Sequence, residues 1–339
     1  MAWLGEELSV ELLEHATRFA PRTVKDEIVE ARCEGGRVLF SDLSVVFMDT
    51  TSLAFEGAGG RDLGRRGHSK DKRPDLNQMI LGVVIDGEGR PVCSEMWPGN
   101  TADVAVLVPI IDRLRHRFGI GRVCVVADRG MISAATITAL EDRGLEYVLG
   151  VRERSDKLVR ELVLDDEKPM TPLLIERQAG ETQLFVKEVT INAAEGKRRY
   201  IVARNEAEVE KDRADRAAIV AALDRQLEKG DKALVGNSAY RRDLRKSHGA
   251  EGGSARVFEI DPGKLAEEAR YDGIFVLRTN ARISPLVAVL RSRVLLQVEE
   301  LFRTAKALMH PRPIYHSADA AIRGHVFCSI LALFRRKEL

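Results

Sequence analysis

The stretch Ser44–Ser52, SVVFMDTTS, constrains the fold more than any other part of the sequence. Its four consecutive apolar residues, Val45–Met48, are typical of a short strand that is buried on both faces of a sheet. Asp49 follows this run directly, and three hydroxyl residues come after it. We therefore expect the strand to end at Asp49, which places the Asp49 carboxylate at the rim of a sheet.

The same pattern recurs in the stretch Val123–Met131, VCVVADRGM. Val123–Ala127 predicts a second buried strand, and Asp128 comes just past its end, before an Arg-Gly turn. Open α/β sheets bind ligands outside the carboxyl ends of their strands, so Asp49 and Asp128 could converge on one ligand. Two carboxylates suit a hard cation such as Mg²⁺. Each aspartate alone is also consistent with a helix N-cap or a turn residue after a strand.

The order of the elements predicted up to residue 151 indicates the fold class. Apolar runs at residues 79–86 and 91–97 predict a β-hairpin, and helical spacing covers residues 101–118 and 133–143. A further short strand is predicted at residues 145–151. The resulting order, strand-strand-strand-helix-strand-helix-strand, is the ribonuclease H-like pattern. We expect an α/β protein with a mixed sheet.

Four regions are expected along the chain. Residues 1–43 form a short helical N-terminal remnant, and residues 44–151 form the first part of the ribonuclease H-like core. Residues 152–284 form a β-rich inserted subdomain, with a hairpin, a charged helix at 206–229 and two later strands. Residues 285–339 return to the core as helices. The insertion is expected because Asp128 and the next candidate carboxylate, Glu299, lie 171 positions apart.

A glycine-rich cationic loop, GAGGRDLGRRGHSKDKR, occupies Gly57–Arg73. Flexible chain rich in glycine, lysine and arginine can lie along a phosphate backbone, because such contacts release counterions. The same charge run is also consistent with a solvated surface loop. The residues of this loop that we expect to contact DNA are Arg65, Arg66, Lys70, Lys72 and Arg73.

A second cluster of charge lies in Val298–Lys306, VEELFRTAK, within a strongly helical stretch. Glu299, Arg303 and Lys306 occupy positions i, i+4 and i+7, which places them along one helix face. An acid facing two bases on one stripe is also an ordinary pattern of surface ion pairs.

The compartment is constrained mainly by what the sequence lacks. It contains no run of eighteen apolar residues and no basic segment followed by a short apolar one at its start, so we expect neither export nor a membrane span. Its four cysteines fit no zinc spacing and are typical of a reducing compartment. We expect a cytoplasmic protein. The net charge of +1 argues neither for nor against nucleic acid.

Six segments together resemble the DDE transposases of the IS4 superfamily, specifically the IS1634-like insertion-sequence transposases. They are VVFMDTTSLAFEG, LGRRGHSKDKRPDLNQMILGVVID, GRPVCSEMWPGNTADV, CVVADRGMIS, ARYDGIFVLRTN and QVEELFRTAKALMHPRPIYH, and they follow the family's order between Ser44 and Phe334. The resemblance implies a ribonuclease H-like catalytic core that a β-rich insertion interrupts before its last helix. It also implies metal-dependent DNA strand cleavage and strand transfer during transposition of an insertion sequence.

The resemblance assigns the catalytic residues one by one. Asp49 and Asp128 match the first and second catalytic aspartates, and Glu299 matches the closing glutamate. Glu299 is preferred over Glu300 because the signature Tyr-x2-Arg-x3-Glu-x6-Lys needs a lysine seven positions after the glutamate, and Lys306 satisfies that spacing only from Glu299. The three carboxylates would hold two Mg²⁺ or Mn²⁺ ions, which activate the attacking oxygen and stabilise the leaving one. Arg303 and Lys306 would bind phosphates of the element's end.

The implied partners are the DNA ends of the insertion sequence and target DNA, in the nucleoid of a prokaryotic cytoplasm. Pairing of two ends implies a homodimer on DNA. The sequence departs from the signature at Ser292 and Leu295, where tyrosine and arginine are expected, and it is short at both ends compared with family members. A truncated, catalytically weak or inactive transposase that binds DNA or the full-length transposase as a regulator is therefore an alternative. A ribonuclease H-like nuclease without element specificity is a third.

Overall fold

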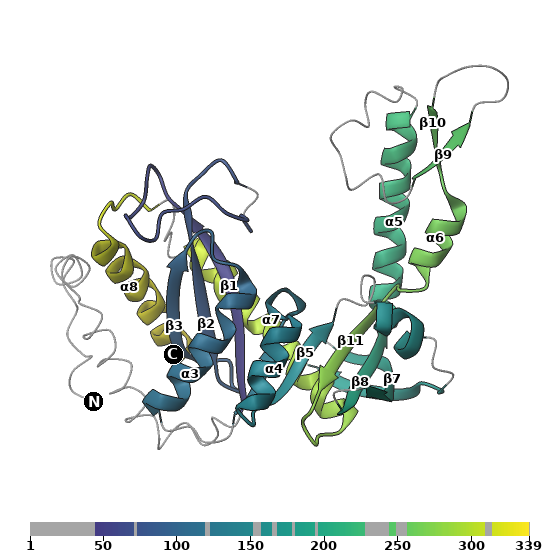
Figure 1. Cartoon of the computed structure of the whole chain (residues 1–339), viewed down its shortest axis with the longest axis horizontal. Helices are drawn as coiled ribbons and strands as arrows, with labels where there is room; N and C mark the ends of the chain where they lie inside the picture. The colour runs from purple at the N-terminus through teal and green to yellow at the C-terminus, as the bar shows by residue number, and fades with distance from the viewer. Residues whose placement is uncertain are drawn as a thin grey trace. The chain divides into compact units, whose positions relative to one another are not determined.

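The computed structural model in Figure 1 describes residues 45–70, 73–118, 123–151, 157–164, 168–177, 180–193, 196–227, 244–248, 256–308 and 314–338. The predicted N-terminal region 1–43 lies outside these residues. The chain divides into two compact units. The first unit contains Met1–Gly150 and Arg278–Leu339, and the second contains Val151–Leu277.

The first unit is built on a mixed sheet. Its strands lie in the order β3-β2-β1-β4-β5, with bounds Pro91–Pro98, Gln78–Ile85, Val45–Ala54, Cys124–Ala127 and Glu146–Val151 respectively. β1, β4 and β5 run parallel, whereas β2 runs antiparallel to both β1 and β3. This order and these directions are those of the ribonuclease H-like fold, so the predicted fold class is confirmed.

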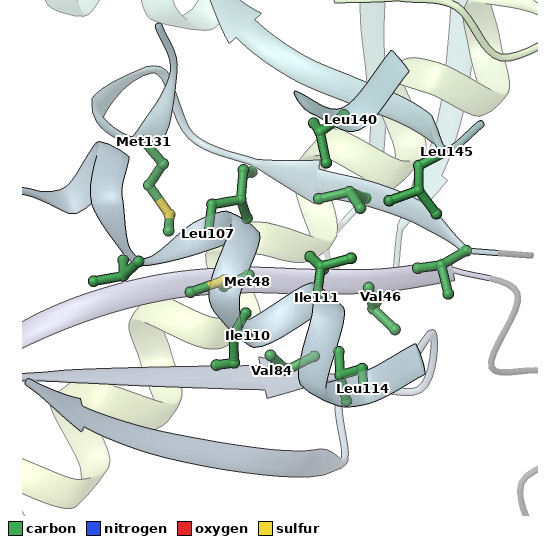
Figure 2. Close-up of a cluster of buried hydrophobic side chains, with 14 of the residues drawn as sticks. Val46, Met48, Val84, Leu107, Ile110, Ile111, Leu114, Met131, Leu140 and Leu145 are labelled. Carbon is green, nitrogen blue, oxygen red and sulfur yellow. The ribbon is translucent and has the colours of Figure 1, made fainter. Parts of the chain in front are cut away.

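Helices pack on both faces of this sheet. α3 (Leu107–Phe118) and α4 (Ala134–Asp142) bury apolar side chains against alternate residues of β1, among them Val46 and Met48 (Figure 2). Phe47 is buried as well, and side chains alternate along a strand, so it faces the opposite side. On that side α7 (Pro285–Leu308) packs against β1 and β4. α8 (Asp319–Glu338) contacts α7 and β3.

β1 is longer than the sequence indicated. We expected the strand to end at Asp49, but it continues to Ala54, and Asp49 pairs with Val83 of β2. The pairing with β2 runs the full length from Phe47 to Ala54, whereas the parallel pairing with β4 stops at Met48. Asp49 therefore lies inside β1, at the point where β1 loses its partner on one side.

The cationic loop after β1 is fixed to the first unit by hydrogen bonds, which corrects the expectation of a flexible chain for its described residues. The backbone N–H groups of Asp62 and Leu63 donate to the Asp319 carboxylate at the start of α8, at 3.0 and 3.1 Å. Arg65 and Gln78 exchange two backbone hydrogen bonds. A Cβ atom at Gly67 would overlap the carbonyl oxygen of Gly99, so only glycine fits this close approach.

The second unit has its own strands and core. Its main strands lie in the order β11-β8-β7-β6, with bounds Ile274–Thr279, Gly196–Asn205, Gly180–Ala193 and Thr171–Arg177. β9 (Leu244–His248) and β10 (Arg256–Ile260) form a separate hairpin next to the long helix α5 (Glu206–Leu227). The sequence predicted the hairpin β7–β8, the helix α5 and the strands β10 and β11. It did not predict β6, β9, the helix α6 (Pro262–Ala269) or the π-helical turn Val159–Leu164.

Among the described helices, none is both long enough and apolar enough to cross a membrane.

Candidate active site

The register of the parallel strands brings Asp49 and Asp128 to neighbouring positions. The last parallel pair of β1 and β4 is Met48 with Ala127, and each aspartate is the next residue of its chain. Asp128 keeps an extended backbone and then begins the short 3-10 turn Arg129–Met131. Alternation along β1 directs Asp49 away from the cluster that contains Met48, toward the face on which α7 packs.

Glu299 lies on α7, the helix that packs against the two strands carrying the aspartates. Its neighbour Val298 and the residue one turn later, Phe302, are buried, which fixes this part of α7 against the rest of the first unit. Glu299 itself is exposed, as is Asp128. Both side chains are therefore open to solvent beside a partly buried Asp49.

The electrostatics of Asp49 reflect this neighbourhood. Its side chain is 17% exposed, and burial is the main cause that raises its pKa to about 6. The charges of Asp128 and Glu299 raise this pKa further, whereas Lys70 and the backbone N–H of Thr50 lower it. Asp128 and Glu299 thus both lie close enough to Asp49 to influence its charge. In the part of the chain that the structure describes, no three His, Cys, Asp or Glu side chains gather tightly enough to hold a metal ion as they stand.

A second group of polar residues adjoins Asp49, and the sequence pattern did not reveal it. The Lys70 ammonium donates to the carbonyl oxygen of Thr50 at 2.6 Å and to Thr50 Oγ1 at 2.7 Å. It lies 3.5 Å from Asp103 Oδ2 and 3.8 Å from Asp49 Oδ1. Thr50 Oγ1 donates in turn to Asp103 Oδ1 at 2.7 Å. Lys70 therefore bridges the carboxylate of Asp49, which was predicted as a site residue, and that of Asp103, which was not.

Asp103 comes from the segment before α3. The helix predicted from residue 101 begins instead with a 3-10 turn, Asp103–Ala105, and α3 follows from Leu107. This turn contacts the Arg129–Met131 turn that follows Asp128. A fourth carboxylate is thus positioned at the same edge of the sheet. In the sequence, Asp103 lay within the helix predicted at residues 101–118 and carried no separate signal.

The residues predicted to contact DNA occupy different environments. Arg65 and Arg66 are exposed on the loop, and Arg65 also donates to the carbonyl oxygen of Gly64. Arg73 makes a bidentate ion pair with Asp75. On α7, Arg303 is exposed and Lys306 is half-buried.

The remaining predicted DNA contacts are Lys70 and Lys72. The Lys70 side chain is 31% exposed, and its ammonium points to the carboxylates described above. Lys72 lies outside the described residues.

Structural comparison finds only distant similarity to solved transposases. A piggyBac transposase synaptic complex with hairpin DNA matches with 13% identity over 87% of this chain and 54% of that chain, at a TM-score of 0.29. The catalytic domain of Mos1 mariner transposase matches with 17% identity over 43% of this chain and 63% of that chain, at a TM-score of 0.22. These scores are too low to carry an argument. The chain spans about half the length of the piggyBac chain that it matches.

Sequence comparison assigns the family. A search of curated proteins gives no match. The family model described as Transposase DDE domain matches residues 40–334, which contain all five strands of the first unit and the helix that carries Glu299. The chain belongs to this family of transposase DDE domains.

Proposed function

We propose that this protein is an insertion-sequence transposase, IS1634-like within the IS4 superfamily, that cleaves DNA strands and joins them to a target. One observation carries the proposal. Asp49 and Asp128 follow the last residue pair of two adjacent parallel strands, and Glu299, on the helix against those strands, acts electrostatically on Asp49. Two strand-end aspartates and a helical glutamate are the arrangement that the family resemblance assigns to catalysis.

DDE transposases use divalent metal ions, and the side chains here fit such ions chemically. Asp49, Asp128 and Glu299 offer only oxygen atoms, the ligands that Mg²⁺ and Mn²⁺ prefer. Asp128 and Glu299 are open to solvent, so an ion and a phosphate have access to them. We assign all three as ligands of two ions, which would polarise the phosphate and activate the attacking oxygen when bound.

The protein's own cations would position the DNA. Arg303 follows Glu299 by one helical turn and Lys306 by two, so both side chains lie after the carboxylate on the same face of α7. The exposed Arg65 and Arg66 offer further phosphate contacts on the loop, and Lys72 and Arg73 extend the same basic segment. Contacts of this kind set the register of a DNA backbone without reading its bases. Cleavage of both ends of an element would use two copies of the chain, as a homodimer on DNA.

The test is a cleavage and joining assay with a matched pair of variants. Purified protein is incubated with Mn²⁺ and a plasmid that carries its own coding sequence with the flanking DNA. The parent is expected to release the element and to join it to target DNA. Glu299→Gln is expected to lower both rates by at least about a hundredfold, since it removes a metal ligand. Glu300→Gln, the adjacent exposed acid, is expected to keep parental rates. Equal rates for the two variants would refute the assignment of Glu299.

Two residues on α7 favour a regulator as a second candidate function. Ser292 and Leu295 are half-buried where the family signature has tyrosine and arginine, so contacts to the DNA end made by those two side chains would be lost or weakened. A regulator of this kind would bind the plasmid's element ends without cutting them. Retention of labelled end DNA by the parent, with no cleavage in Mn²⁺, would favour this function over the catalytic one.

A further inference from the structure

The Lys70 ammonium occupies a position that phosphate binding alone does not explain. It lies between Asp49 and Asp103, and both of its short hydrogen bonds go to Thr50, a residue only 1% exposed. A lysine that serves only to bind DNA phosphate is expected to extend into solvent, because its ammonium is strongly hydrated. Here the ammonium is turned toward the sheet instead.

The backbone explains why the ammonium can lie there. β4 ends at Ala127, so β1 has a strand partner on one side only beyond Met48. The Thr50 carbonyl oxygen accepts a hydrogen bond from Lys70 instead of from a strand. A buried carbonyl group needs such a donor. The Lys70 backbone N–H is held separately by Ser52 Oγ at 3.0 Å, so the main chain is fixed while the side chain remains free to change partners.

The charges around Asp49 point to the same role for Lys70. The charges of Asp128 and Glu299 act on the Asp49 carboxylate, which also lies 3.8 Å from the Lys70 ammonium. Lys70 is the cation that counteracts these charges at Asp49, because it lowers the pKa that they raise. If a divalent ion bound the Asp49 carboxylate, its positive charge would lie next to that of the Lys70 ammonium unless the ammonium moved away.

We propose that Lys70 is a built-in counter-ion of the metal site, which competes with the divalent ion for Asp49 and transfers to a DNA phosphate when the ion binds. The inference rests on the proposed metal site. The four-carbon stem of lysine allows the transfer without movement of the main chain. Metal binding at Asp49 releases Lys70 to a phosphate, and a phosphate draws Lys70 away from Asp49, so metal and DNA bind cooperatively. By linkage, DNA must raise the affinity for metal by the same factor as metal raises the affinity for DNA. Lys70 is thus a positioning residue for Asp49.

Binding of Mn²⁺ alone tests the competition. The signal of free Mn²⁺ in electron paramagnetic resonance reports the dissociation constant without any need for activity. Lys70→Met is expected to bind Mn²⁺ about fivefold more tightly than the parent, the scale of one partly exposed ion pair. Lys211→Met is the matched control, because it removes the same charge from an exposed pair with Glu208 on α5. Its affinity is expected to equal that of the parent.

DNA tests the transfer. Addition of a short duplex is expected to tighten Mn²⁺ binding to the parent and to Lys211→Met severalfold, and to tighten binding to Lys70→Met much less. Unchanged or weaker Mn²⁺ binding by Lys70→Met would overturn the inference. If in that case the parent bound Mn²⁺ and Asp49→Asn did not, the proposed metal site would stand although the role of Lys70 would not. Absence of Mn²⁺ binding by every variant would overturn both the inference and the proposed site.

A measurement on the parent protein covers the case in which Lys70→Met fails to fold. Acetylation of Lys70 by a water-soluble reagent is followed by mass spectrometry with and without Mn²⁺. Displacement from Asp49 and Thr50 exposes the ammonium, so Mn²⁺ is expected to increase the rate of acetylation severalfold at Lys70 and not at Lys211. An equal or lower rate at Lys70 would overturn the inference.

Discussion

At the scale of single residues, Asp49 combines burial with like-charged neighbours. Burial raises its pKa to about 6, and Asp128 and Glu299 act in the same direction. Its ionised form is therefore costly in the metal-free protein at neutral pH, and Lys70 offsets only part of that cost. A divalent ion would remove this penalty, because metal ligands bind in their deprotonated form.

This penalty predicts that Asp49→Asn stabilises the metal-free protein at neutral pH. Between pH 3.8 and about 6 the folded state binds more protons at Asp49 than the unfolded state, so the parent's free energy of unfolding falls as the pH rises through this window. Asparagine does not titrate. The variant should gain up to about 3 kcal/mol relative to the parent between pH 4 and pH 7, since each pKa unit corresponds to 1.36 kcal/mol. Urea denaturation in a chelating buffer measures the difference, and a difference that is independent of pH would contradict the cause.

The sequence predicted only some of the residues around Asp49. An aspartate after a run of buried apolar residues is a local pattern, and it indicated Asp49 and Asp128. The Lys70–Thr50–Asp103 contacts join residues 20 and 53 positions apart, through hydrogen bonds that depend on where the loop and the turn before α3 return to the sheet. No local pattern encodes such contacts. Lys70 was accordingly interpreted as a DNA contact alone.

At the scale of elements, the sequence pattern of β1 predicted the end of the strand too early. Thr50, Thr51 and Ser52 are all buried within the strand, although three consecutive hydroxyl residues are typical of a turn. Threonine is also well suited to strands, which was the overlooked signal. The helix α5 was predicted from its first residue and to within two residues of its end, because long helical segments leave less ambiguity.

In the second unit, the ion pair of Arg216 is expected to contribute far more to the free energy of unfolding than the ion pair of Arg213 on the same helix. Arg216 of α5 pairs bidentately with Asp272, which is nearly buried, whereas Arg213 pairs with the exposed Glu210. Arg216→Met leaves a buried carboxylate without its cation and should cost about 3 kcal/mol. Arg213→Met should cost less than about 1 kcal/mol. Denaturation of the two variants measures the difference, and equal losses would show that burial of Asp272 has no energetic role.

At the scale of the whole molecule, each of the two units has its own core. One cluster joins β1 and β4 to α3 and α4, and a separate cluster in the second unit surrounds Tyr200, Val202 and Val276. The second unit lies in the sequence between β5 and α7, so Glu299 follows Asp128 by 171 positions and still returns to the strands that carry Asp49 and Asp128. The spacing of the carboxylates indicated an insertion, but the fold of the insertion followed only in part from its sequence.

The most direct test of the shared metal site is the shift in melting temperature that Mn²⁺ causes in the parent, Asp49→Asn, Asp128→Asn and Glu299→Gln. A ligand that binds only the folded state stabilises it by about 2.7 kcal/mol at a hundredfold excess over its dissociation constant. The comparison uses the shift and not the absolute temperature, because Asp49→Asn alters stability without metal. We predict a clear rise in the parent that is lost or strongly reduced in all three variants. An equal shift in the parent and the variants, or a loss confined to one of them, would contradict a site that the three carboxylates share.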